Sequence, residues 1–377
     1  MNRHLTRLLA TAAAGVSLSM TGLAATADAA QSVSAAAATF SGRLYSVAAL
    51  SPTDAWAVGL HPNSSLIVHW DGRSWTQSLA GAGYYNGVAA DSAGDAWAVG
   101  GTNWFSPART LAEHWNGTTW TRVPSPTPAG GGIFAAVTAT SPSNAWAVGR
   151  TGGGPGVTGV FKPLIEHWNG TAWTQQRFPL PANGGLLTSV AATSATNAWA
   201  VGWTGSTSPG AGSQTLIEHW NGRTWTRVAS PNPAGTVSLL DAVAASGPGN
   251  VWAVGYSVTN AGPHKALILH WQAGAWVVVP APSPTGDVAL QSVATTSHSD
   301  VWAVGLTRPT TCNPQCGTLI EHWNGKTWRQ VPSPNPPAGY LNAFLGVAAL
   351  NCHNAWAVGT TDYASTLIAH WNGKSWN

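Results

Sequence analysis

One sequence pattern recurs seven times along this chain, and it limits the possible folds more than any other feature. Each copy has a Trp-Ala-Val-Gly segment, a variable stretch, a His-Trp pair and a third tryptophan five residues after the second. The copies follow one another at intervals of 41 to 54 residues and hold 21 of the 23 tryptophans. The repeat tryptophans are Trp56, Trp70, Trp75; Trp97, Trp115, Trp120; Trp146, Trp168, Trp173; Trp199, Trp220, Trp225; Trp252, Trp271, Trp276; Trp302, Trp323, Trp328; Trp356, Trp371 and Trp376. Self-similarity at this period indicates a repeat architecture in which each copy is one supersecondary unit.

Each copy contains four short apolar runs separated by turn residues, which is the pattern of four antiparallel strands. We name them strands a to d; in the second copy they span residues 86–90, 96–100, 111–115 and 119–123. Seven such sheets predict an all-β fold, a seven-bladed β-propeller with four antiparallel strands per blade, over residues 41–377. The Asn-Gly pair between strands c and d, as at Asn116, predicts a type I′ hairpin turn. The fifth copy has Gln272-Ala273-Gly274 instead, and a less regular hairpin is expected there.

The repeat resembles that of the kelch and galactose-oxidase-type propellers. Trp-Ala-Val-Gly stands where kelch repeats have a strand ending in Gly-Gly, and the third tryptophan stands where kelch has its own tryptophan. The resemblance covers about residues 41–377 and implies the propeller architecture. Two features depart from kelch: the glycine doublet occurs only at Gly100 and Gly101, and His-Trp-Asn-Gly replaces the kelch tyrosine and its acidic turn. Ancestry and activity therefore stay open.

The N-terminus predicts export. Arg3 and Arg7 precede an Ala- and Leu-rich stretch over residues 8–23, and Ala27-Asp28-Ala29 matches a cleavage site. Residues 1–29 are therefore expected to be a secretory signal peptide, and the protein to be secreted. No later segment has the length and apolarity of a membrane span. Residues 30–40 form a separate N-terminal segment, and within it residues 32–40 are a candidate for the outer strand of the seventh blade.

Charge and cysteine content narrow the set of partners. Removing Arg3, Arg7 and Asp28 from the 16 basic and 13 acidic residues leaves 14 and 12, with no run of either sign, which argues against nucleic acid. Cys312 and Cys316 are expected to form a local disulfide in an exported protein, with Cys352 left as a free thiol. We predict no catalytic residue, metal site or cofactor, and we expect a monomer.

Residues that recur in every blade have a structural interpretation. The repeat tryptophans are expected to form the core between blades, because each buries a large apolar ring. The strand-c histidine, as at His69, is interpreted as a packing or hydrogen-bonding residue, since a catalytic histidine need not occur seven times. The Asp or Asn two residues before each strand-b tryptophan, as at Asp54, is expected to stabilise the a-to-b turn. Four glutamates precede the histidine and are expected to pair with donors, because a buried unpaired charge is costly: Glu113, Glu166, Glu218 and Glu321.

Loop lengths point to one face of the propeller as the place of binding. The a-to-b interval is 9 residues in all copies and the c-to-d interval is always 5, whereas the b-to-c interval runs from 10 to 18 and the d-to-a interval from 13 to 19. Antiparallel order places both variable classes on one face, which we call the loop face, and variable loops on a rigid scaffold are the usual place of binding. Alternatively, some aromatic rings there only anchor the loops. The predicted ligand-binding residues are Trp104, Phe105, Trp203, Tyr84, Tyr85, Tyr256, Arg109, Arg150 and Arg308.

Three functions are compatible with these features. The leading hypothesis is a secreted binding module that recognises a glycan or an extracellular, cell-surface protein through the loop face, where aromatic faces bury apolar surface and polar neighbours supply hydrogen bonds. The second is a structural or protein-interaction propeller without a small ligand. The third is a glycan-active enzyme. A sialidase-like site would need an arginine triad, for which Arg109, Arg150 and Arg308 lie on the expected face. A copper-oxidase-like site would need a Tyr-Cys pair and two histidines at the axis, which no sequence feature brings together.

Overall fold

The computed structural model describes residues 39–61, 64–78, 81–103, 108–152, 160–205, 212–259, 262–282, 284, 286–308, 316–336 and 341–377, and statements on structure below refer to them. Their secondary structure consists of strands grouped into seven antiparallel sheets, each in chain order. Blades 1 and 2 are β1 (Arg43–Ser51), β2 (Asp54–His61), β3 (Ser64–Trp70), β4 (Trp75–Ser78) and β5 (Tyr84–Ser92), β6 (Asp95–Gly101), β7 (Thr110–Trp115), β8 (Trp120–Arg122). Blades 3 and 4 are β9 (Gly132–Ser141), β10 (Asn144–Thr151), β11 (Lys162–Trp168), β12 (Trp173–Gln175) and β13 (Gly185–Ser194), β14 (Asn197–Thr204), β15 (Thr215–Trp220), β16 (Trp225–Arg227). Blades 5, 6 and 7 are β17 (Thr236–Gly247), β18 (Asn250–Thr259), β19 (Lys265–Gln272), β20 (Ala275–Val278); β21 (Asp287–Ser297), β22 (Asp300–Arg308), β23 (Gly317–Trp323), β24 (Trp328–Gln330); and β25 (Asn342–Asn351), β26 (Asn354–Thr361), β27 (Ser365–Trp371).

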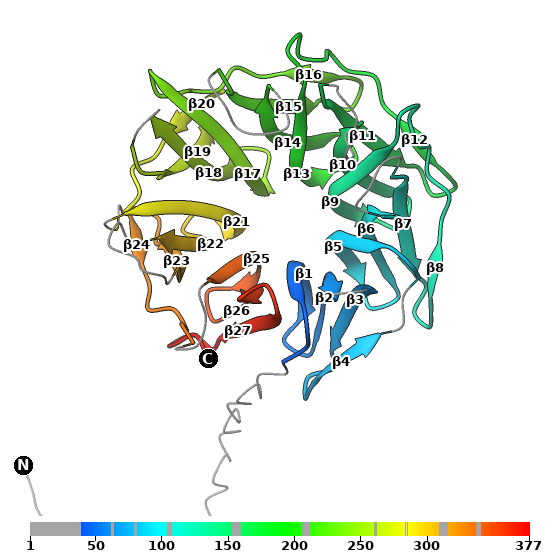
Figure 1. The fold of residues 1–377 in the computed structure, drawn as a ribbon, viewed down its shortest axis with the longest axis horizontal. Helices are drawn as coiled ribbons and strands as arrows, with labels where there is room; N and C mark the ends of the chain where they lie inside the picture. Colours follow the sequence, from blue (N-terminus) through cyan, green and yellow to red (C-terminus); the bar gives the residue numbers. More distant parts are fainter. Residues whose placement is uncertain are drawn as a thin grey trace, which may run out of the picture. The chain divides into compact units, whose positions relative to one another are not determined.

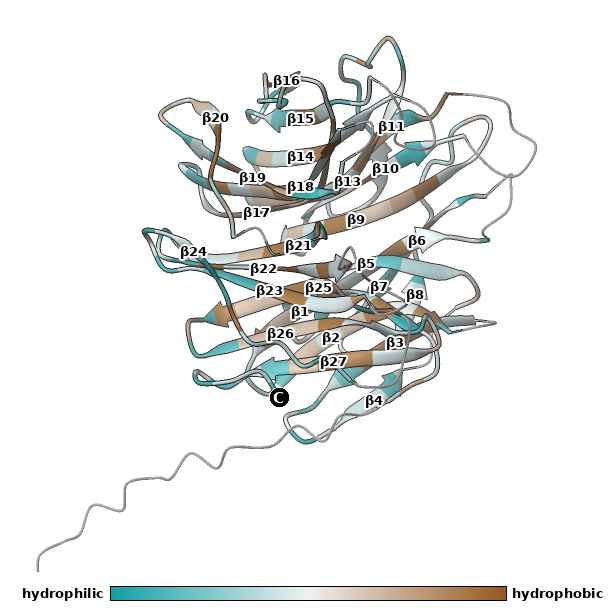
Figure 2. Ribbon diagram, turned by 60° about the vertical axis from the view of Figure 1, so that its left-hand side comes forward, coloured by the Kyte–Doolittle hydropathy of each residue, from teal (hydrophilic) through white to brown (hydrophobic). Residues whose placement is uncertain are grey.

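The blades surround a common axis, with strand a of each blade innermost and strand d outermost (Figure 1). This confirms the predicted all-β, seven-bladed propeller with four antiparallel strands per blade. In the seventh blade the outer strand is reduced to a single bridge between Trp371 and Trp376. Apolar residues are concentrated along the inner strands, as the long brown stretch of β9 shows (Figure 2).

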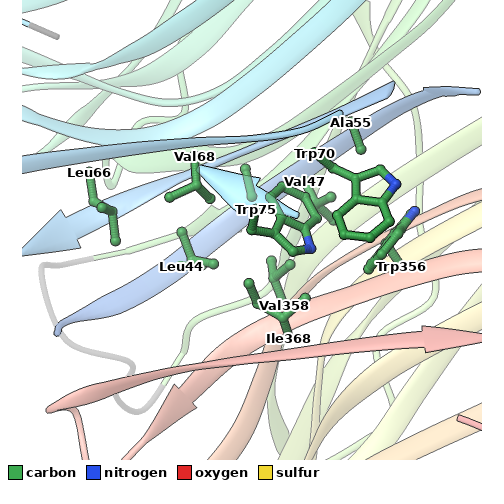
Figure 3. Packing of buried hydrophobic residues seen from close by; sticks show 11 residues of the cluster. Leu44, Val47, Ala55, Leu66, Val68, Trp70, Trp75, Trp356, Val358 and Ile368 are labelled. Atoms are coloured by element: carbon green, nitrogen blue, oxygen red, sulfur yellow. The ribbon is translucent and has the colours of Figure 1, made fainter. Parts of the chain in front are cut away.

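The repeat tryptophans form the contacts between blades, as predicted. Each strand-b tryptophan packs against the strand-c and strand-d tryptophans of the next blade; Trp56 lies 5.0 Å from Trp115 and 5.1 Å from Trp120, between ring centroids. The same contact closes the ring, because Trp356 of blade 7 lies 5.1 Å from Trp70 and 5.2 Å from Trp75 of blade 1. Figure 3 shows this cluster, in which Leu44, Val358, Ile368 and their neighbours fill the space between the two blades.

The N-terminal segment contacts blade 7. The Phe40 backbone N–H donates to Thr366 Oγ1 at 2.9 Å, and the Thr366 backbone N–H donates to the Phe40 carbonyl at 2.9 Å. Ser41 forms a bridge with Ser365 at the start of β27. Phe40 thus lies along the outer side of strand c, where strand d and its continuation lie in other blades. Residues 32–38 of the candidate closing strand lie outside the described residues, so a closing role for the whole segment stays a prediction.

The predicted c-to-d turn was wrong in type. Strand c ends at Trp115 and strand d begins at Trp120, so the connection has four residues. Its Asn116 side chain accepts the backbone N–H groups of Thr118 and Thr119, both at 3.0 Å, and only Gly117, at φ 91°, is left-handed. The two-residue type I′ turn occurs instead in blade 5, where Ala273 and Gly274 both have positive φ. Sequence spacing did not show that asparagine would cap the loop with its side chain.

In six of the seven blades, the Asp or Asn two residues before the strand-b tryptophan has a partner that the sequence did not predict; in blade 7, Asn354 Oδ1 and His370 Nε2 have no hydrogen-bond partner. Asp54 Oδ1 lies 2.8 Å from Nε2 of His69, and the centroid of the His69 ring lies 4.1 Å from that of Trp56, with the planes tilted by 30°. The same pairing occurs in blades 2 to 6, for example between Asn197 and His219 at 2.8 Å. The histidine therefore has the structural role that its recurrence predicted: it connects strand c to the a-to-b turn.

The prediction that every strand-c glutamate has a donor holds for two of the four. Glu218 pairs with Arg227 at 3.1 Å, and Glu113 accepts the backbone N–H of Gly81 at 3.3 Å. Glu166 and Glu321 are fully buried, and neither carboxyl oxygen of either residue has a hydrogen-bond partner. Burial raises the pKa of both to about 8, so both are protonated at neutral pH, which avoids the cost of a buried charge.

Candidate functional site

The inner strands differ from blade to blade at one position. In each strand a, the residue that directly follows the partner of the strand-b glycine is bulged out of the pairing with strand b. Where these side chains are polar they reach the adjacent inner strand: Asn86 Nδ2 donates to the Phe134 carbonyl at 2.7 Å, and Thr188 Oγ1 donates to the Leu240 carbonyl at 2.8 Å. This position holds a different residue in every blade, so it distinguishes the blades from one another where the repeat residues make them alike. The seven residues are Tyr45, Asn86, Ala135, Thr188, Asp241, Gln291 and Leu345.

One of these bulged residues, Gln291, lines a pocket between blades 5 and 6, which we call the blade 5–6 pocket, and Asp241 is hydrogen-bonded to Gln291. Its volume is about 230 Å³. The polar part of its wall comes from the end of β18, the b-to-c loop of blade 5 and the start of β21. It therefore lies on the loop face. The lining residues are Tyr256, His264, Asp287, Val288, Ala289, Gln291 and Leu306.

The polar groups of this pocket are held by one another. The His264 backbone N–H donates to Asp287 Oδ1 at 2.8 Å, and the imidazole Nδ1 lies 3.5 Å from Oδ2. The His264 ring meets the Tyr256 ring edge to face, with centroids 4.9 Å apart. Gln291 Nε2 donates to Asp241 Oδ2 at 3.2 Å. The ring faces and hydrogen-bonding groups of the pocket are thus fixed before a ligand arrives.

The carboxyl group of Asp241 gives the pocket an unusual electrostatic setting. Burial beside the axis raises the pKa of Asp241 to about 7. The pKa of Tyr256 is raised by burial and by the nearby charge of Asp241. Asp241 therefore keeps its proton to a higher pH than an exposed aspartate does, and in that form its carboxyl group can donate a hydrogen bond.

A second group, which includes the predicted Tyr84 and Arg150, meets at blades 2 and 3. The Arg150 guanidinium lies 3.8 Å above the Phe161 ring, and burial lowers the pKa of Arg150. Burial, opposed by the charge of Arg150, raises the pKa of Tyr84 to about 12. Tyr84 and Phe161 are buried, so this group anchors loops rather than presenting a surface, as the alternative interpretation of the aromatic rings foresaw.

A third group lies on the loop face where blade 7 meets blade 1. The Arg43 guanidinium lies 4.6 Å from the centroid of the Tyr363 ring, which is 55% exposed. Asp362 and Tyr363 both have left-handed φ, 56° and 59°, which costs energy for residues other than glycine. The turn therefore holds an aromatic ring in solvent beside a cation.

The remaining predicted site residues are dispersed. Tyr85 is fully buried in the core between blades 1 and 2, so it cannot contact a ligand in this conformation. Trp203 is partly buried at the end of β14 rather than in a loop. Arg109 is exposed and its backbone pairs with Thr102. Arg308 ends β22 of blade 6, and Arg150 lies in β10 of blade 3.

Three predicted residues lie outside the described residues: Trp104, Phe105 and Cys312. The predicted disulfide of Cys312 with Cys316 is therefore untested. Cys316 is buried, and Cys352 is exposed in the a-to-b turn of blade 7. Within the described ranges, no three His, Cys, Asp or Glu side chains are grouped so as to hold a metal ion, and no helix is long and apolar enough to cross a membrane.

Comparison with known proteins gives the fold and not the family. No protein-family model matches the sequence, and no curated protein is similar to it at a significant level. Among solved structures, a YCF48 protein bound to a D1 peptide is similar with a TM-score of 0.54 at 15% identity, covering 88% of this chain and 94% of that one. The GH74 xyloglucanase of Xanthomonas campestris is similar with a TM-score of 0.58 at 15% identity, covering 90% of this chain and 54% of that one. A PL25 ulvan lyase is similar with a TM-score of 0.58 at 10% identity, covering 89% and 95%.

These similarities support a seven-bladed propeller and no closer relationship, since all three identities are low. The narrower resemblance to kelch and galactose-oxidase-type proteins is not confirmed and stays a prediction. Function has to be argued from the sites of this chain.

Proposed function

We propose that the protein is a secreted binding module that recognises a glycan on its loop face, with the blade 5–6 pocket as the contact site. The observation that carries the proposal is the pocket itself, where ring faces, a carboxylate, an imidazole and an amide converge on one small space. A sugar residue offers apolar C–H faces to an aromatic ring and hydroxyl groups to polar side chains, and this wall supplies both kinds of contact.

The pocket volume indicates how much of a ligand it holds. Pockets for whole drug-sized ligands measure about 300–1,000 Å³, and the blade 5–6 pocket measures about 230 Å³. It therefore fits one residue of a longer chain, whose neighbours would extend across the loop face. Two of the similar propellers are a xyloglucanase and an ulvan lyase, which supports a polysaccharide ligand, while the one bound to a peptide supports a protein ligand. The signal-peptide pattern of residues 1–29 supports an extracellular location.

The test is binding of the purified protein to a panel of soluble glycans and insoluble polysaccharides. Tyr256→Ala removes one ring from the pocket, and Tyr363→Ala removes an exposed ring elsewhere on the same face as a matched control. We expect binding that Tyr256→Ala weakens and Tyr363→Ala retains. Absence of binding to every glycan would reject the proposal and leave the second hypothesis, a protein-interaction propeller without a small ligand.

A further inference from the structure

The outer rim of the propeller carries a second recurring contact, which we call the hydroxyl clasp. It joins the residue four positions before the strand-c histidine to the segment that follows strand d or, in blade 7, to the N-terminal segment. In blade 2, Ser125 Oγ donates to Thr110 Oγ1 at 2.8 Å, and Thr110 Oγ1 donates to the Pro126 carbonyl at 3.1 Å. Equivalent contacts of strand c are Ser65 to the Gly81 carbonyl in blade 1, Thr215 to Ser230 in blade 4, Thr318 to Ser333 in blade 6 and Thr366 to Phe40 in blade 7.

Two blades lack the hydroxyl clasp, and they differ in what replaces it. Blade 5 has Ala266 and Ala281, two small side chains that pack against its core. Blade 3 has Pro163 on strand c and Phe178 after strand d, in the sequence Gln-Arg-Phe-Pro-Leu-Pro, where blade 2 has Val-Pro-Ser-Pro-Thr-Pro. Proline and phenylalanine cannot form the clasp, and a pocket opens at this place.

This blade 3 rim pocket has a volume of about 460 Å³, twice that of the blade 5–6 pocket. It lies on the outer part of the loop face, between the segment that precedes β9, the start of β11 and the segment that follows β12. Apolar side chains form much of its wall, and Leu180 is 50% exposed. The lining residues are Pro128, Ala129, Thr151, Lys162, Pro163, Gln175, Gln176, Arg177, Phe178 and Leu180.

The charge around the rim pocket is positive. Lys162 and Arg177 line it and are exposed, and no acidic side chain lines it. Between residues 123 and 240 the chain has five basic residues and only two acidic ones, Glu166 and Glu218, both fully buried. Glu218 is already paired with Arg227. The two exposed cations therefore have no acidic partner within blades 3 and 4.

We infer that the blade 3 rim pocket docks an acidic segment of a partner protein that also carries apolar side chains. Lys162 and Arg177 attract the carboxylates, while Phe178, Leu180 and the prolines take up an apolar side chain between them. The apolar part of the wall is formed by Leu180, Phe178 and prolines, which suit a leucine-like side chain. This site is independent of the glycan proposal, because none of its lining residues belongs to the blade 5–6 pocket.

The test uses labelled synthetic peptides and fluorescence anisotropy with the purified protein. The probe is a short peptide in which glutamate and leucine alternate, with a lysine-leucine peptide and a glutamate-serine peptide as controls. We expect binding of the glutamate-leucine peptide that weakens as salt is added, since exposed charge pairs are screened. The double variant Lys162→Glu and Arg177→Glu should weaken it by about tenfold or more.

Two further variants keep the inference falsifiable. Arg223→Glu reverses an exposed charge in the c-to-d turn of blade 4, on the opposite face, and should leave binding unchanged. Pro163→Thr with Phe178→Ser restores the clasp residues of the other blades and should abolish binding while the circular dichroism spectrum stays native. Absence of peptide binding, equal binding of the lysine-leucine peptide, or binding unaffected by the double charge reversal would overturn the inference. Binding of polygalacturonate in place of the peptide would also overturn it, because it would assign the pocket to an anionic glycan.

Discussion

The buried carboxyl group of Glu166 makes the stability of the propeller depend on pH in a direction opposite to the usual one for acids. Burial without a partner raises its pKa from 4.5 to about 8. The folded chain therefore keeps a proton that the unfolded chain releases above pH 4.5. Because folding takes up this proton, the contribution of Glu166 to stability falls as the pH rises from about 4.5 to about 8, and it is constant above that range.

The substitution that tests this is Glu166→Gln. The glutamine side chain is uncharged in both the folded and the unfolded chain, and its shape is close to that of glutamate. Each pKa unit corresponds to about 1.4 kcal/mol. At pH 7, which is about 2.5 units above the pKa of the unfolded chain, the protonated Glu166 therefore lowers the free energy of unfolding by about 3 kcal/mol. We expect Glu166→Gln to match wild type near pH 4 and to exceed it by about 3 kcal/mol at pH 7. For a domain of this size that corresponds to a rise in Tm of about 4 °C.

The assay is urea unfolding of wild type and variant in parallel across pH 4 to 8, so that other titrating groups cancel in the difference. Gln175→Arg is the matched comparison, because Gln175 lies opposite Glu166 in the strand register as Arg227 lies opposite Glu218. It should shift the upper end of the pH window toward pH 7, the pKa of the paired Glu218. A difference between wild type and Glu166→Gln that is the same at pH 4 and pH 8 would refute the reasoning, since it would mean that Glu166 is ionised when folded.

Three further predictions concern the scaffold. Deleting residues 30–40 should lower Tm in scanning calorimetry because the clasp on β27 is lost, and an unchanged Tm would reject a closing role for this segment. Trp146→Ala should cost about 3–5 kcal/mol in urea unfolding, since its ring fills the space between blades 3 and 4, whereas Trp203→Ala at a partly exposed site should cost less than half of that. A double-mutant cycle of Asn197→Ala and His219→Ala should give a coupling energy of about 1 kcal/mol, and zero coupling would mean that stacking alone holds the histidine.

The scaffold was predictable because every blade has to bury the same kinds of apolar side chain, so the same residues recur seven times. A tryptophan such as Trp97 has to be buried in every blade, so its recurrence alone indicated the core, and the four apolar runs indicated the strands. Pairings between elements were harder to predict. The hydrogen bond between Asn197 and His219 joins residues 22 apart, and only their joint presence in each copy could have suggested it.

The candidate sites were predictable in part. Tyr256 was predicted from its aromatic ring and its place near a variable loop, and the structure puts it in the blade 5–6 pocket. Asp241 and Gln291 were missed, because both lie inside strands and a bulge leaves no mark on hydrophobic alternation. Aligning the copies with one another would have revealed the position, since its residue differs in all seven. Phe178 was missed for a similar reason. It is notable only by comparison with blades 2, 4 and 6, which have a serine at the equivalent position.

The central claim is that residues shared by all blades build the scaffold and residues peculiar to one blade bind the ligand. The most direct test replaces Asp241 and Gln291 together with threonine, the residue that bridges the inner strands at Thr188, and measures Tm and binding to the glycan panel. The account predicts an unchanged or higher Tm together with loss of the binding that wild type shows. Retained binding at full strength, or a collapse of the fold, would contradict it.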